Sequence, residues 1–130
     1  MSTSRKTPSS RRNAAQAYRE RSILTASSQK LVAMLIERSV RDLERARLAL
    51  SGGREQESQQ SIEKVQSILI ELRASLDPQG GELAERMDRL YEFSLDRLAT
   101  ASQDKDATPI EEALRALRPL EQAWQAVVAS

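Results

Sequence analysis

The side chains that carry most enzyme chemistry are absent from this sequence, which contains neither cysteine nor histidine. Their absence removes thiol nucleophiles, imidazole bases, Cys/His zinc sites and disulfide bonds together. Pairs such as Glu37/Arg41 lie four residues apart, which is the spacing of solvated neighbours on one helix face. Glu121 is the one ionisable residue near a predicted apolar helix face. We therefore expect no enzyme activity, no catalytic residue, no metal site and no cofactor.

Composition limits the classes of protein further. The 130 residues suit one domain, and the charged share of 30% is nearly balanced at a net charge of +1. Balanced charge argues against a dedicated nucleic-acid-binding or membrane-surface protein. The longest apolar run, Leu31 to Ile36, is far shorter than the ~20 residues needed to span a bilayer, and we find no signal-peptide pattern. We expect a cytoplasmic protein with no membrane insertion.

The first 26 residues differ in composition from the rest. Residues 1–22 carry a net charge of +5, since six basic residues face Glu20 alone, and the remaining residues carry −4. With few apolar side chains, such a segment buries too little surface to offset the entropy cost of ordering. We predict a basic, largely flexible N-terminal arm over residues 1–26 and a folded domain over residues 27–128. Weak contact of the arm with RNA or acidic lipid is an open alternative.

The folded domain has the apolar spacing of helices, with steps of three and four residues and no alternation of period two. Capping residues, glycines and prolines set the expected bounds. The four predicted helices run from Ser27 to Gly52-Gly53, from Arg54 to Leu76, from Glu82 to Ala101, and from a capping box at Thr108 to Val128. Short connections place neighbouring helices antiparallel. We therefore predict an all-α fold, an antiparallel up-down-up-down four-helix bundle.

Several apolar residues fall outside the main apolar face of their helix. At about 100° per residue, Met34 and Val40 lie off the face of the first helix that carries Leu31, Leu35 and Leu43. Ile70 on the second helix and Phe93 on the third are displaced in the same way. Exposed apolar residues on several helices are typical of a surface for a partner. A core wider than one stripe, or burial under the N-terminal arm, remains the alternative.

Motifs along most of the chain resemble those of one known family, the flagellin-specific export chaperones, or FliS family. The first is an alanine-tyrosine pair followed by a helix start and a Met-Leu step. The resemblance rests on Ala17-Tyr18, Thr25-Ala26-Ser27-Ser28-Gln29-Lys30-Leu31 and Met34-Leu35, on Ser75-Leu76-Asp77 with Gly80-Gly81-Glu82-Leu83-Ala84, on Leu90-Tyr91-Glu92-Phe93 with Arg97-Leu98, and on Leu117-Arg118 with Trp124. The chain departs from the pattern at Ser28, where proline is common, and at Ile36, where tyrosine usually follows.

This resemblance implies a non-enzymatic chaperone that binds the C-terminal segment of unpolymerised flagellin in apolar grooves. It further implies that the chaperone prevents premature filament assembly and delivers flagellin to the flagellar type III export gate. We assign the flagellin-binding grooves to a set of six residues, three of which stand in the motifs above. The set is Met34, Ile36, Val40, Ile70, Tyr91 and Phe93. The resemblance also implies an N-terminal arm that covers part of this surface, with Tyr18, Ile23 and Leu24 as a displaceable plug or an export-gate contact.

Two other functions remain open from the residues alone. A self-associating structural bundle would bury its outward apolar residues against another copy, so we expect either a monomer or a weak homodimer. A nucleic-acid accessory protein would act through the basic arm, although balanced charge makes nucleic acid the less favoured partner.

Overall fold

The computed structural model contains four helices and, within residues 8–129, no strand. It describes the backbone of residues 8–129 and the side chains of residues 28–129. The helices are α1 (Pro8–Ser51), α2 (Glu55–Ala74), α3 (Gly81–Asp104) and α4 (Ala107–Ala129). The predicted all-α fold class is confirmed.

Helix α1 begins at Pro8, well before the predicted start near Ser27. Proline suits the first helical position, and neither glycine nor proline recurs before Gly52, so nothing in the sequence interrupts the helix. The flexibility of the arm and the domain boundary at residue 27 stay predictions. The predicted C-terminal end is confirmed: Gly53 has a φ of 79°, and the Arg54 amide donates a hydrogen bond of 2.7 Å to the Ala49 carbonyl.

The other two connections are also short. Between α2 and α3, Asp77 Oδ1 accepts a hydrogen bond of 2.9 Å from the Gln79 amide, and Gly81 has a φ of 70°. Before α4, Asp106 Oδ1 accepts one of 3.0 Å from the Thr108 amide. The predicted capping box at Thr108 is therefore wrong, because α4 begins at Ala107 and Asp106 is the residue that caps it.

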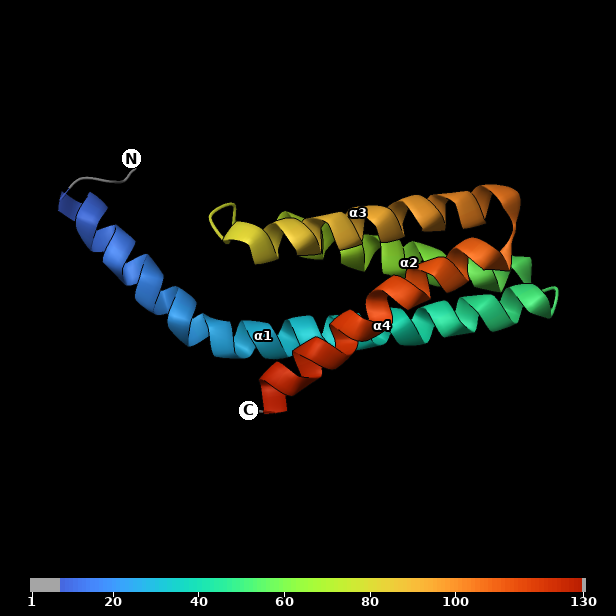
Figure 1. Cartoon of the computed structure of the whole chain (residues 1–130), viewed down its shortest axis with the longest axis horizontal. Helices are drawn as coiled ribbons and strands as arrows, with labels where there is room; N and C mark the ends of the chain where they lie inside the picture. The colour runs from blue at the N-terminus through green and yellow to red at the C-terminus, as the bar shows by residue number, and fades with distance from the viewer. Residues whose placement is uncertain (1–7, 130) are drawn as a thin grey trace.

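The helices form an antiparallel up-down-up-down bundle, and the chain reverses direction at each connection (Figure 1). Helix α1 packs against α2 and α4, and α3 packs against the same two helices. Helices α1 and α3 therefore lie on opposite corners of the bundle, with α2 and α4 on the other two. Each helix has two neighbours, so each buries a wider face than a helix with one partner.

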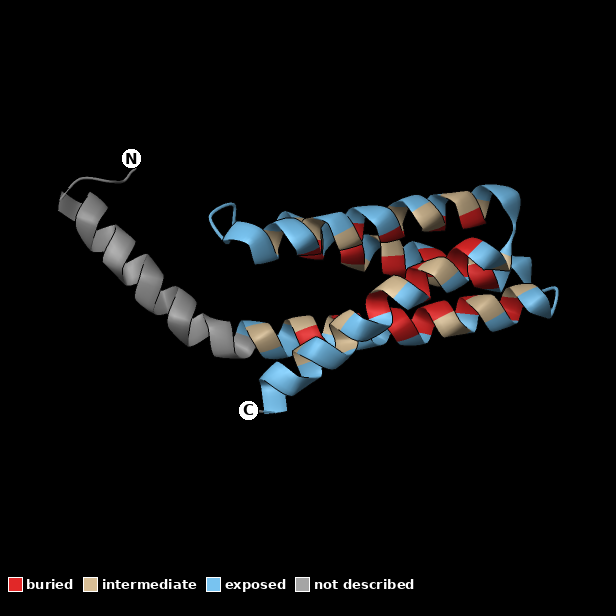
Figure 2. Cartoon of the chain, viewed as in Figure 1, coloured by how far each residue is buried: buried red, intermediate tan, exposed pale blue. Residues whose placement is uncertain are grey.

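The core is unevenly distributed along the bundle. In α3 the first buried residue is Met87, and in α4 the last is Leu117. Antiparallel packing brings the start of α3 and the end of α4 to one end of the bundle, and Figure 2 shows both segments largely exposed there. We call this the open end. The fully buried large side chains lie between it and the opposite, closed end: Ile36, Leu43, Ile62, Val65, Leu69, Tyr91, Leu98, Ile110, Leu114 and Leu117.

Candidate partner-binding surface

Three of the six predicted groove residues are exposed. Met34 of α1, Ile70 of α2 and Phe93 of α3 have exposed fractions of 58%, 57% and 45%. Each lies off the buried face of its helix, as its spacing predicted. Their role in binding flagellin stays a prediction.

The other three predicted groove residues lie in the core, so their placement on the surface was wrong. Ile36 is fully buried, and Val40 and Tyr91 are almost completely so. Because α1 packs against both α2 and α4, its buried face is wide enough to include Ile36 and Val40. Burial raises the pKa of the Tyr91 phenol to about 12, so the ring is neutral.

The predicted contacts of the N-terminal arm lie outside the described side chains. Tyr18, Ile23 and Leu24 fall within the backbone of α1, and side chains are described only from residue 28. Their role as a plug or as an export-gate contact stays a prediction.

The structure identifies a second apolar surface that the sequence did not single out. Leu83 lies four residues before the buried Met87, on the core-facing side of α3, yet its exposed fraction is 67%. Leu120 and Trp124 continue the stripe of Leu117 on α4 and are only partly buried. We call this surface the open-end patch. Its members are Leu31 and Leu35 of α1, Leu76 after α2, Leu83 of α3, and Leu120, Trp124 and Val127 of α4.

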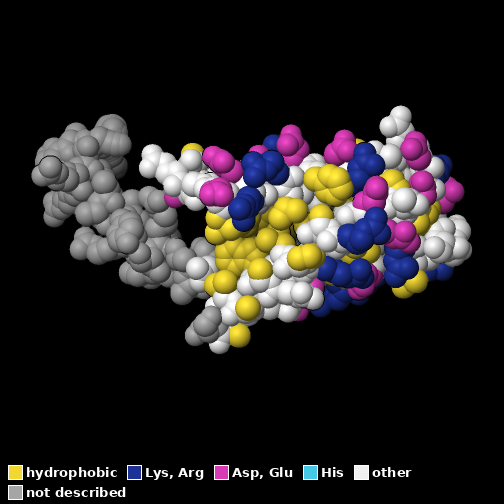
Figure 3. All heavy atoms as spheres, viewed as in Figure 1, with side chains coloured by type: hydrophobic (Ala, Val, Ile, Leu, Met, Phe, Trp, Pro, Cys, Tyr) yellow, Lys and Arg dark blue, Asp and Glu magenta, His cyan; other side chains and the backbone are white. Residues whose placement is uncertain are grey.

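Within residues 28–129, the open-end patch continues the core and is left uncovered. Figure 3 shows hydrophobic side chains gathered between α3 and α4 toward this end, with charged side chains along the border. In Figure 1 the start of α3 and the end of α4 are well separated, so neither helix covers the apolar side of the other. Such a surface could accept the apolar face of another chain.

Ion pairs tie neighbouring helices together around the bundle. Arg73 of α2 donates a hydrogen bond of 2.6 Å to Asp88 of α3, which lowers the pKa of that carboxyl. Nη1 of Arg97 in α3 lies 3.3 Å from Oε1 of Glu112 in α4. Arg118 of α4 pairs with Glu44 of α1. These pairs are partly solvated, so each contributes little to stability.

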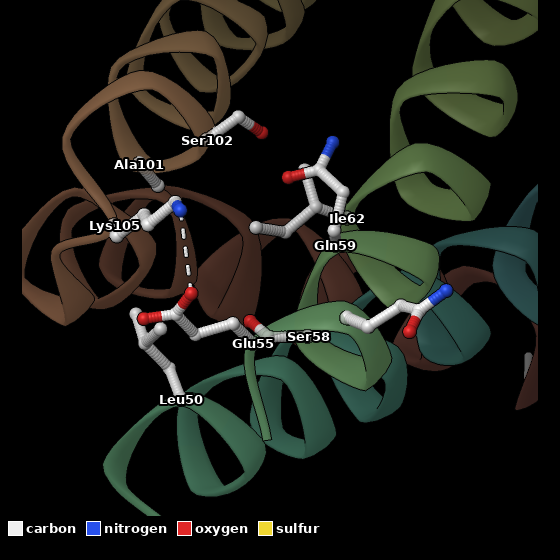
Figure 4. A pocket seen from close by; sticks show the side chains of 9 residues that line it. Leu50, Glu55, Ser58, Gln59, Ile62, Ala101, Ser102 and Lys105 are labelled. Carbon is white, nitrogen blue, oxygen red and sulfur yellow. Dashed lines mark ion pairs between the residues drawn. The ribbon is translucent and has the colours of Figure 1, made fainter. Parts of the chain in front are cut away.

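The closed end carries a pocket of about 310 Å³ lined by residues of α1, α2 and α3. Leu50 and Ile62 form part of its apolar lining, and Lys105 pairs with Glu55 at 3.3 Å across it (Figure 4). The hydroxyl of Ser102 has no hydrogen-bond partner within the described residues.

Among residues 28–129 no cluster of carboxylates is arranged to hold a metal ion. None of the helices in the described part of the chain has a stretch long and apolar enough to cross a bilayer.

The fold and the open-end patch define a class of protein: a small antiparallel helical bundle with an apolar surface that the rest of residues 28–129 leaves uncovered at one end. Residues 11–130 match the family described as flagellar protein FliS. The chain therefore belongs to the FliS family, as its motifs predicted.

Three relatives place the chain within that family over most of its length. The flagellar secretion chaperone FliS of Salmonella typhimurium is 33% identical over 115 residues, which cover 87% of this chain and 85% of the relative. That of Vibrio cholerae is 26% identical over 121 residues, 89% of each chain. The flagellar secretion chaperone FliSB of Pseudomonas aeruginosa is 30% identical over 109 residues, 83% of this chain and 86% of the relative.

Proposed function

We propose that this protein is a cytoplasmic, non-catalytic export chaperone that binds the C-terminal segment of unpolymerised flagellin. By holding that segment it prevents premature polymerisation, and it delivers the subunit to the flagellar type III export gate. The observation that carries the proposal is the open-end patch, because it leaves core-facing residues such as Leu83 exposed. Membership of a family whose named relatives are flagellar secretion chaperones supports it.

The physical basis is coupled folding and binding. A disordered flagellin segment that folds as an amphipathic helix would bury its apolar face against Leu83, Leu120 and Trp124, at about 25 cal/mol per Å² of apolar surface removed from water. The segment must lose conformational freedom to do so, and this cost keeps a large interface reversible. Reversibility suits a chaperone that must release its cargo.

The exposed residues Met34, Ile70 and Phe93 extend the proposed contact beyond the open end. A flagellin segment that wraps around the bundle would use them as separate anchoring points. Tyr18 and Ile23 belong to the segment that we propose to cover part of the surface before flagellin arrives.

A flagellin C-terminal fragment titrated into the full chain by isothermal calorimetry tests the proposal. We expect a one-to-one complex that Leu83→Asp and Phe93→Asp each weaken at least about tenfold, because a carboxylate in an apolar contact must be desolvated. Leu48→Asp is the matched control, since Leu48 is apolar and has an exposed fraction between those of Phe93 and Leu83 but lies toward the closed end of α1. Absence of binding at micromolar concentrations, or an equal loss in the control, would overturn the proposal.

A further inference from the structure

The solvent-facing side of α1 carries a regular stripe of exposed residues, whose N-terminal half borders α4 at Met34 and Arg41. Its members follow each other at steps of four, three, four and three residues, the spacing of a coiled-coil seam. We call it the α1 stripe: Met34, Arg38, Arg41, Arg45 and Leu48. All five are exposed, and Leu48 at one end is as exposed as Met34 at the other, 57% against 58%.

A buried carboxylate orients two of the three arginines. Asp42 is only 5% exposed, and its Oδ2 and Oδ1 lie 3.6 Å from Arg38 Nε and from Arg45 Nη1. The two guanidinium groups are thereby held along the helix on either side of Arg41. A surface whose cations are already oriented loses less side-chain entropy when it binds. Arg41 itself has no ion pair within residues 28–129.

The charge of the α1 stripe determines which partner it can bind. A second α1 stripe is excluded, because three arginines would oppose three arginines at the interface. The positive stripe also stands out from its surroundings, since the chain after residue 22 carries a net charge of −4. An acidic surface at the same spacing is the complement.

The apolar residues at the two ends of the stripe favour an amphipathic helix over a simple polyanion as the partner. Met34 and Leu48 are separated by fourteen residues, which is about 21 Å along a helix at 1.5 Å per residue. Met34 also borders a shallow pocket of about 250 Å³ between α1 and the end of α4, which Ala33 and Val128 line as well. Nucleic acid and phospholipid headgroups have no apolar groups at that spacing.

We propose that the α1 stripe docks an acidic amphipathic helix of another protein, with apolar residues two heptads apart and carboxylates at the seam positions between them. One apolar residue enters the pocket beside Met34 and the other packs on Leu48. The carboxylates face the three arginines. This surface shares none of its five residues with the open-end patch, but Met34 is also one of the anchoring points proposed for flagellin, so the two partners would compete at Met34.

A synthetic three-heptad helical peptide tests the proposal. It carries leucine at the two outer seam positions and glutamate at the three between, and its binding to the full chain is followed by fluorescence anisotropy at about 0.15 M salt. A peptide of the same composition in scrambled order is the control for attraction to the basic residues 1–22. Arg41 is the residue whose charge we would reverse, because Arg41→Glu leaves both ion pairs of Asp42 in place.

We expect saturable binding of the patterned peptide, weakened at least about tenfold by Arg41→Glu and by Leu48→Asp. Lys64→Glu on α2 makes the same charge change off the stripe, and Leu83→Asp alters the open-end patch; both should change the affinity less than about twofold. Equal binding of the scrambled peptide, equal loss with Lys64→Glu, or no saturable binding would overturn the proposal. Flagellin binding that survives Arg41→Glu separates this outcome from that of the proposed function.

Discussion

Replacing Ile36 by alanine should destabilise the bundle strongly, whereas replacing Met34 by alanine should not. The two positions lie two residues apart on α1, and both were predicted to face a partner. Ile36 is fully buried in the core, while Met34 is 58% exposed. The pair therefore tests where the buried face of α1 lies.

The expected magnitude follows from burial. Ile36→Ala removes three carbon groups at about 0.8 kcal/mol each, or about 2.4 kcal/mol of transfer free energy. The unfilled cavity adds to this, which brings the loss to about 3–4 kcal/mol, inside the range measured for buried aliphatic residues. For a domain of this size each kcal/mol lowers the melting temperature by about 4–8 °C, so a shift of about 12–32 °C is expected. Met34→Ala should stay within about 0.5 kcal/mol.

Urea unfolding followed by far-ultraviolet circular dichroism measures both free energies. An unchanged slope of free energy against urea would indicate that the variants unfold from equally compact states. Equal losses in the two variants, or a loss below about 1 kcal/mol for Ile36→Ala, would refute the assignment of Ile36 to the core.

Three further predictions concern single groups. Burial, and after it the nearby carboxylates, raises the pKa of Glu121 above its usual 4.5, so the ionised side chain destabilises the fold. Glu121→Gln should therefore raise the urea midpoint of unfolding at pH 7. This gain should disappear as the pH falls through 4.5, because Glu121 is then protonated in the unfolded chain as well. Lys105 has a φ of 51°, which glycine adopts without strain. The Lys105→Gly variant should therefore be more stable than Lys105→Ala by about 1 kcal/mol and melt at a higher temperature, since both lose the same ion pair but only the alanine keeps the strain. The hydroxyl of Ser58 donates a buried hydrogen bond of 2.9 Å to a carbonyl of α1, so Ser58→Ala should lower the free energy of unfolding, measured by chemical denaturation, by about 1 kcal/mol. Ser94→Ala should leave that free energy unchanged or raise it, since the buried Ser94 hydroxyl has no hydrogen-bond partner within the described residues.

The helices and their order followed from local properties of the sequence. Steps of three and four apolar residues, the glycine pair after α1 and the Asp77 turn predicted four helices and an antiparallel bundle, because each signal acts within a few residues. At the start of α1, these local signals allowed a longer helix than the one we predicted. The long run without glycine or proline after Pro8 is compatible with the early start of α1.

The candidate site was less predictable, because exposure depends on which helices meet. Helical spacing identified Met34, Ile70 and Phe93 as outward-facing, and the structure agrees. The same reasoning placed Val40 outside because it assumed that α1 buries a single stripe. Helical spacing alone puts Leu83 on the same side of α3 as Met87, but it does not tell whether a neighbouring helix covers that side.

The sequence by itself therefore determined the fold class, the helix order, the family and the absence of cysteine and histidine chemistry, since all of these depend on residue type and short-range spacing. Only the tertiary structure decided that Ile36, Val40 and Tyr91 are core residues, because burial requires a second and a third helix in contact. It also decided that the apolar face is uncovered at the open end. Leu83 is exposed there because α3 and α4 separate toward that end, and no spacing along one helix reports the distance to another.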